Sequence, residues 1–255
     1  MIANFHTHTY RCHHGVGTEE EYVRCGVEAG FQILGISDHA PYVFPADYRP
    51  PFRMAVEELG EYVAAVEDAR RRYGHQISIP LGVEAEFYPR FFRDTVTLLR
   101  DHGIEYMLLG QHMLFNEIEG ISTAPATADA ALLRQYCDQT VEAIYTGLFT
   151  YFAHPDIMNF VGNRAIYREQ MGRICHAAKA CDLPLEINLL GMQLQRQYPC
   201  EEFWRLAAEA GCKVVLGMDA HKPEALLDTQ LEPKARALAA KFDLEVLETV
   251  PLKRL

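Results

Sequence analysis

Residues 2–8 of the chain read IANFHTH, a short apolar run that ends in two histidines. The run from Ile2 to His6 is predicted to be the first strand. Because side chains two residues apart lie on the same side of a strand, His6 and His8 can both reach one metal ion. A single H-x-H pair is weak evidence, since the chain has 11 histidines and a strand histidine is often structural. Whether His6 and His8 are read as metal ligands therefore depends on whether similar histidine or carboxylate residues follow the other strands.

A histidine or a carboxylate follows almost every predicted strand. Further strands are predicted at residues 33–37, 77–83, 105–109, 150–153, 184–187 and 213–216. Short apolar or β-branched runs separated by segments of helical period are typical of βα units around a parallel sheet. The polar residues at the strand ends are His6, His8, Asp38, His39, Glu84, His112, His154, Glu186, Asn188, Asp219 and His221.

The segments between these strands carry helix signals. Thr18 and Glu21 form a capping box, which predicts a helix that ends near Gly30. Apolar positions at helical spacing predict further helices at about 54–73, 91–102, 132–145, 171–180 and 203–210. The loop at 40–53 contains prolines and four aromatic residues, which either pack together or line a pocket.

The polar strand ends distinguish two architectures that share this alternation. In a closed barrel the ends of the strands converge on one mouth, where active sites are assembled. In an open, doubly wound sheet they would spread along an edge. We therefore predict an α/β fold of the TIM-like barrel type, although the pattern does not separate six, seven and eight strands. The length and the lack of a linker-like stretch predict a single domain over 1–255.

Composition limits the partners and the compartment. The net charge of −11, from 35 acidic and 24 basic residues, disfavours binding to nucleic acid. Arg70–Arg72 is interpreted as a solvated helix face, with a phosphate or nucleic-acid contact as the alternative. Seven cysteines without a C-x-x-C pair argue against a disulfide framework or a thiolate zinc site. With no signal-like start and no apolar run of about 18 residues, we expect a cytoplasmic protein without a membrane partner.

The ligand types indicate the class of metal. Histidine and carboxylate without thiolate suit zinc, manganese or iron better than magnesium or calcium. Four histidines fall outside the strand-end set, namely His13, His75, His102 and His176, and we expect surface or helix-capping roles for the last three.

The same residues lie within seven motifs, HTHTYRCHHG, GISDHAP, GVEAE, GQH, AHPD, EINLLG and GMDAH. In this order, and along nearly the whole chain, the motifs resemble those of the PHP (polymerase and histidinol phosphatase) superfamily, above all its histidinol-phosphatase branch. The resemblance implies a distorted (β/α)7 barrel that carries two or three divalent ions.

The resemblance also implies how the ligands divide among the ions. The first ion would be held by His6, His8, Glu84 and Asp219, and the second by His14, His39 and His221. Glu84 would bridge to a third ion held with His112 and His154. The choice of His14 over His13 rests on the spacing in the family. Asp38 and Glu86 are expected to lie outside direct ligation.

Clustered divalent ions lower the pKa of a bound water and neutralise charge on a phosphoryl group, which predicts hydrolysis by a metal-bridging hydroxide. Asp219 or His221 is the candidate to protonate the departing alkoxide. Arginine suits phosphate best, but where the family reads G-L-R this chain has Gly191-Met192-Gln193. Arg196 and Arg164 are the candidates to replace it, the alternative being that each is a surface arginine.

The predicted function is a histidinol-phosphatase-type phosphomonoesterase, which converts L-histidinol phosphate and water to L-histidinol and phosphate. Gln193 leaves open another small phosphorylated substrate, including a nucleotide, for a phosphatase or phosphodiesterase of the same superfamily. A polymerase-associated domain and a non-catalytic metal-binding scaffold are two further hypotheses. The acidic charge argues against the former, and the complete set of ligands argues against the latter.

Overall fold

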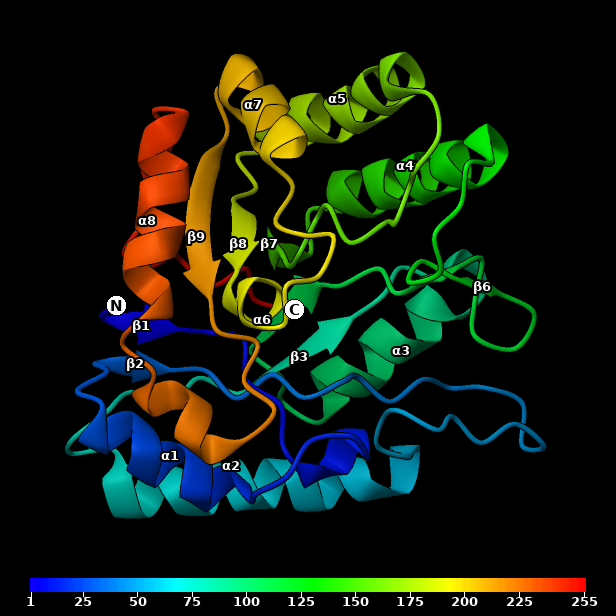
Figure 1. Cartoon of the computed structure of the whole chain (residues 1–255). Coiled ribbons are helices and arrows are strands. Elements are labelled where there is room, and N and C mark those ends of the chain that lie inside the picture. The colour runs from blue at the N-terminus through cyan, green and yellow to red at the C-terminus, as the bar shows by residue number, and fades with distance from the viewer.

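Seven short parallel strands form the centre of the molecule in the computed structural model, which describes residues 1–255 (Figure 1). Hydrogen bonding joins β3, β4, β7, β8 and β9 in one sheet, with the short strand β10 (Glu245–Val246) at the edge beside β9, and it joins β1 and β2 in another. The strands are β1 (Ala3–Asn4), β2 (Ile33–Leu34), β3 (Gly82–Ala85), β4 (Tyr106–Leu109), β7 (Phe149–Phe152), β8 (Leu185–Asn188) and β9 (Lys213–Gly217).

Single bridges close these two sheets into a ring. The segment after β2 meets β3 through the parallel bridges Ile36 to Leu81 and His39 to Glu84. The segment after β1 meets the end of β9 through Thr7 and Ala220, where the His8 backbone N–H donates to the Ala220 carbonyl at 2.9 Å. The ring therefore runs β1-β2-β3-β4-β7-β8-β9, which confirms a distorted (β/α)7 barrel. The distortion lies where bridges replace continuous ladders.

Helices pack around the outside of the strands, with α1 and α2 along one side and α4, α5 and α7 along the opposite side in Figure 1. The capping box is confirmed, because the Thr18 side chain accepts from the Glu21 N–H and the Glu21 side chain accepts from the Thr18 N–H. The helices are α1 (Glu19–Glu28), α2 (Leu59–Tyr73), α3 (Pro89–Asp101), α4 (Ala130–Tyr145), α5 (Arg164–Ala180), α7 (Glu201–Ala210) and α8 (Leu231–Lys241).

The inside of the barrel is apolar at one end and polar at the other. A buried cluster fills the apolar end, and Val250, from the segment after the last strand β10 (Glu245–Val246), joins it. The cluster comprises Ala3, Phe5, Tyr106, Leu108, Tyr151, Ala153, Val215 and Val250. The larger core, with residues such as Leu34, Val83 and Trp204, comprises the other buried apolar side chains. A filled base leaves the opposite mouth as the place for a site.

Some elements differ from the sequence-based expectation. The strand expected at 77–83 is regular only at Gly82–Ala85, because its first residues make only isolated bridges, Ser78 to Ile33 and Leu81 to Ile36. A hairpin after β4, formed by β5 (Met113–Leu114) and β6 (Ile121–Ser122), was not expected. Neither were the short helix α6 (Leu189–Gln193), helix α8 and strand β10. No helix combines the length and the apolar character that crossing a bilayer requires.

Candidate metal centre

Glu84, at the end of β3, lies at the centre of the histidines that follow the other strands. Its Oε2 atom is 3.2 Å from His39 Nδ1, 3.4 Å from His8 Nε2 and 3.5 Å from His6 Nε2. Its Oε1 atom is 2.8 Å from His154 Nε2 and 3.6 Å from His112 Nε2. One carboxylate thus faces imidazoles from several separate segments of the chain. This is the convergence expected for a barrel mouth.

Two further groups of potential ligands adjoin Glu84. His6 and His8 have their Nε2 atoms 3.0 Å apart, and Asp219 Oδ1 is 3.4 and 3.2 Å from them. In the second group, His14 Nε2 is 3.0 Å from His221 Nε2, and ligand atoms of both lie within 4.8 Å of one in His39. His14, rather than His13, reaches this group, because its Nε2 atom faces His221, whereas His13 ends the short helix Tyr10–Cys12 in a left-handed conformation.

The charges at the centre fit a cation. Glu84 is buried, and its two carboxylate oxygens face imidazole nitrogens, the nearest being His154 Nε2 at 2.8 Å from Oε1. Burial alone would raise the pKa of this carboxyl, but the imidazoles around it, His112 first, hold that pKa well below its ordinary value. A buried, ionised carboxylate is costly unless positive charge compensates it. The donors are imidazole nitrogens and carboxylate oxygens, the set that suits zinc, manganese or iron.

The pKa of His221 is lowered to about 4 by burial and by the neighbouring His8. At neutral pH its imidazole is therefore uncharged, and only the uncharged ring has a nitrogen lone pair free for a metal. His39 is similar, because burial and then its histidine neighbours leave its pKa well below the ordinary value.

Buried carboxylates behind the histidines fix their orientation. Glu186 Oε2 is 2.8 Å from His6 Nδ1, so the other nitrogen of His6 faces the candidate site. Asp38 accepts hydrogen bonds from the backbone N–H groups of Thr9 and His39 at 2.9 and 2.7 Å. Both carboxylates are engaged away from the centre, as partners behind metal-binding histidines generally are. The expectation that Asp38 lies outside direct ligation agrees with this geometry.

Glycines at two strand ends leave room for the inward carboxylates. A Cβ atom at Gly110 would lie 1.8 Å from Glu84 Oε1, and one at Gly217 would lie 2.1 Å from Glu186 Oε2. These contacts are too short for any real atom pair, so the carboxylates occupy the space that a side chain would need. The first residues of the motifs GQH and GMDAH thus shape the centre without providing a ligand.

We expect Gly110→Ala to displace the Glu84 carboxylate and to lower the metal content of the purified protein. The matched control is Gly172→Ala in α5, where an added Cβ meets nothing within 4 Å. Alanine there should stabilise the helix by about 0.5–1 kcal/mol and leave metal content unchanged. Elemental analysis and thermal unfolding of both variants make the test. Parent-like metal content in Gly110→Ala would show that Glu84 tolerates the displacement.

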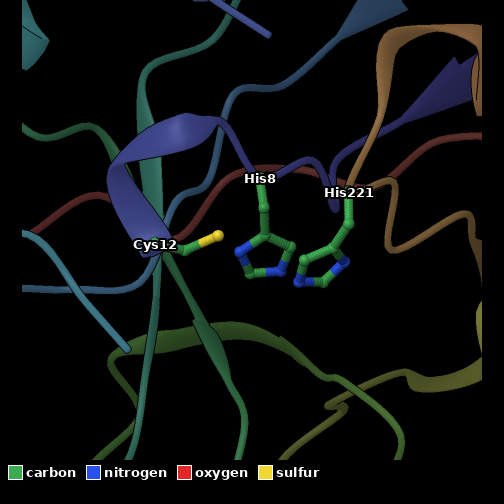
Figure 2. Close-up of side chains that lie close together, drawn as sticks. All are labelled: His8, Cys12 and His221. Carbon is green, nitrogen blue, oxygen red and sulfur yellow. The ribbon is translucent and has the colours of Figure 1, made fainter. Parts of the chain in front are cut away.

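Cys12 lies beside the second group of ligands. Figure 2 shows its sulfur facing the His8 ring, and the His221 ring stacks on the other side of His8 with centroids 4.2 Å apart. The thiol donates to the Thr9 carbonyl at 3.1 Å and accepts from the Gly15 N–H at 3.0 Å. Burial raises its pKa to about 12, so it stays protonated. The sulfur lies within 4.8 Å of ligand nitrogens in His8 and His221, and its two hydrogen bonds brace the loop that carries His14.

A cavity of about 520 Å³ opens above the histidines. Phe52, Leu190 and Leu194 give it an apolar wall, and Arg196 is its one arginine. The Arg196 guanidinium donates to the Tyr198 hydroxyl at 2.7 Å. A second hollow, of about 610 Å³, is lined by residues such as Arg70 and Glu105 and has no comparable histidine group.

The structure separates the two arginine candidates for phosphate. Arg164 does not line the cavity, because Glu202 binds its guanidinium, with Nε at 2.7 Å from Oε2, and the group stacks on Tyr167. The geometry therefore does not support the expectation for Arg164. Gln193 is exposed and does not line the cavity either. Of the loop aromatics, Phe52 lines the cavity, while Tyr42, Phe44 and Tyr48 pack on one another.

Tyr198 and the wall residues Leu190 and Leu194 were missed by sequence reasoning, because they carry no metal-ligand chemistry; Phe52 belongs to the loop for which a pocket wall was one of the two expectations. Tyr198 and Arg196 follow the unpredicted helix α6, and the wall residues Leu190 and Leu194 lie in it or at its end. The chain offered one signal, the Tyr198-Pro199 pair, since proline often marks an ordered turn.

Comparison with known proteins gives consistent results. A family model described as PHP domain matches residues 4–189. A relative from Deinococcus radiodurans, named probable histidinol-phosphatase, is 28% identical over 228 residues, which cover 87% of each chain. A histidinol-phosphatase from Bacillus subtilis is 29% identical over 118 residues, 43% of each chain.

The fold also matches solved structures. The crystal structure of histidinol phosphate phosphatase from Lactococcus lactis, complexed with zinc, L-histidinol and phosphate, superposes with a TM-score of 0.75. The match covers 97% of this chain and 96% of that one at 18% identity. A putative histidinol phosphatase from Listeria monocytogenes superposes with a TM-score of 0.67 at 20% identity, covering 88% and 96%.

Proposed function

This chain belongs to the PHP domain family, and on that basis we propose that it is a metal-dependent phosphomonoesterase that hydrolyses L-histidinol phosphate to L-histidinol and phosphate. The names of the relatives support this substrate, and so do the L-histidinol and phosphate bound to the Lactococcus protein. The observation that carries the proposal is the convergence of histidines on the buried Glu84 beneath a cavity that contains an arginine.

We assign the metal ligands by proximity and chemistry. His6, His8 and Asp219 would hold one ion with Glu84, and His14, His39 and His221 would hold a second. A third would lie between Glu84, His112 and His154. Two or three ions of zinc, manganese or iron, when bound, would supply an activated water and neutralise phosphoryl charge. The full set of proposed ligands is His6, His8, His14, His39, Glu84, His112, His154, Asp219 and His221.

The remaining roles fall to residues of the cavity. Arg196 would bind the phosphoryl oxygens, because charge-assisted hydrogen bonds from a guanidinium suit a phosphate. Tyr198, whose hydroxyl accepts from Arg196, would hold that guanidinium in place. The apolar wall of Phe52, Leu190 and Leu194 would hold the alcohol part of the substrate and exclude water. The role of Asp219 or His221 in protonating the departing alkoxide stays a prediction.

A second candidate is a phosphatase of the same family that acts on another small phosphoester. The observation that favours it is Gln193, which replaces the family arginine and faces solvent instead of the cavity. The phosphate contact then depends on Arg196, which approaches from a different position in the chain, so the alcohol that fits beside it could differ.

Phosphate release distinguishes the two candidates. Protein purified with Mn²⁺ or Zn²⁺ should release phosphate from L-histidinol phosphate faster than from a panel of small phosphomonoesters and diesters. His8→Ala should lose this activity, because the His8 imidazole belongs to the group proposed to hold the first ion, with Asp219 Oδ1 at 3.2 Å and Glu84 Oε2 at 3.4 Å. Turnover of another ester alone would support the second candidate, and no turnover of any ester would refute both.

A further inference from the structure

Arg53, in the loop before α2, has a fully buried side chain. The charged groups around it are not among the proposed metal ligands. Its guanidinium donates to the Ala40 carbonyl at 2.7 Å and to Glu86 Oε2 at 2.8 Å, and it also contacts Glu117 Oε1. The rings of Phe52 and Tyr42 lie 4.8 and 5.1 Å from its central carbon. Contacts on several sides fix its position.

Glu86 connects this arginine to the candidate metal centre. Its second oxygen, Oε1, is 2.9 Å from His112 Nδ1, and the other nitrogen of His112 is 3.6 Å from Glu84 Oε1. The carboxylate of Glu86 therefore accepts from Arg53 with one oxygen and from His112 with the other. An imidazole that donates from Nδ1 keeps its lone pair on Nε2, the nitrogen that faces Glu84.

Only one of the two carboxylates around Arg53 reaches a proposed metal ligand. Glu86 and Glu117 are two buried carboxylates that share one guanidinium. A carboxylate that accepts from the outer nitrogen of a ligating imidazole raises the basicity of that ring. Glu117 does not contact His112, and its Oε1 accepts from the Tyr88 hydroxyl at 3.2 Å instead. The two carboxylates thus have the same partner and similar burial, but only Glu86 touches a proposed ligand.

We propose that Glu86, held by Arg53, is a positioning residue that fixes the ring and the tautomer of His112 and thereby the affinity of the third ion. This inference rests on the proposed function only for the identity of that ion's ligands. Arg53 also contacts Phe52, which lines the cavity. The same buried guanidinium therefore contacts both the cavity wall and the carboxylate behind His112.

The test compares Glu86→Gln with Glu117→Gln. An amide has only one accepting oxygen, and that oxygen would accept the hydrogen bond from the Arg53 guanidinium. The NH₂ group of the glutamine would therefore face His112 Nδ1. His112 would then carry its proton on Nε2 and lose the lone pair that ligates. We expect Glu86→Gln to bind the last Zn²⁺ roughly 10- to 100-fold more weakly. Glu117→Gln, which keeps Glu86, should match the parent protein.

The measurement is titration of the metal-free protein with Zn²⁺ against a competing chelator, with no substrate present. Equal weakening in both variants would overturn the proposal, because it would indicate a general structural role for the cluster. Parent-like binding in Glu86→Gln would overturn it too. In a His112→Asn background, Glu86→Gln should add no further effect, and an added loss would show that Glu86 acts elsewhere. The Zn²⁺ titration measures no turnover, so its result can be interpreted whether or not the protein shows phosphatase activity.

Discussion

Replacement of Glu84 by glutamine should lower phosphatase activity by more than about 100-fold, beyond the 10- to 100-fold typical of partners behind the ligands. The amide keeps the shape of the side chain but removes the one carboxylate that the first and the third proposed ions share. The NH₂ group of the amide would also donate hydrogen bonds to the facing imidazole nitrogens, whose lone pairs have to remain free to bind metal. Metal content should therefore fall together with activity.

Glu67→Gln is the matched control for this change. Glu67 lies on α2 and pairs with Arg70 at 2.5 Å near the surface, far in the sequence from any proposed ligand. Exposed pairs of this kind contribute little to stability, so its metal content and turnover should equal those of the parent. Circular dichroism of both variants excludes misfolding as the cause. A Glu84→Gln protein with full metal content and full activity would contradict the assignment of Glu84 as the central ligand.

The second large effect is expected at Arg196. Arg196→Met should lower kcat/KM for L-histidinol phosphate by about 10- to 100-fold, since a hydrogen bond to a charged group contributes about 1.5–3 kcal/mol. Methionine keeps much of the apolar stem and removes the guanidinium. Metal content should not change, because Arg196 touches no proposed ligand and contacts the Tyr198 hydroxyl.

Arg164→Met provides the comparison, because sequence reasoning treated the two arginines alike. Arg164 is engaged with Glu202 and stacks on Tyr167, so kinetics of this variant should match the parent. Steady-state assays with L-histidinol phosphate over a range of concentrations measure both. If Arg164→Met proved the more damaging change, the phosphate contact would have to come from a rearranged α5 end.

The metal centre is the part for which the sequence-based expectation and the geometry agree most closely. Each of the proposed ligands lies in a short motif at or after a strand, and a barrel brings such positions together whatever the lengths of the helices between them. The distances around Glu84 agree with this convergence. Even the preference for His14 over His13, which came from a family resemblance, agrees with the geometry.

The surroundings of the centre were harder to predict. The loop with Arg53, the hairpin with Glu117 and the helix that precedes Arg196 follow no periodic pattern, because their residues face the site from turns of irregular backbone. A buried guanidinium such as that of Arg53 has the same sequence signature as a surface arginine. Only the packing of distant segments distinguishes them.

Residue order alone therefore predicted the parallel βα architecture, and it indicated the ligand types and the class of metal that suits them, since strand period and donor chemistry are local properties. Tertiary structure decided what depends on contacts between remote segments. It showed that bridges and not ladders close the ring at Thr7 and Ala220, and that Glu202 binds Arg164. It also placed Glu86 between Arg53 and His112. Buried polar groups need hydrogen-bond partners, and in these cases the partners come from segments that are distant in the sequence. The pattern within one segment therefore cannot predict them.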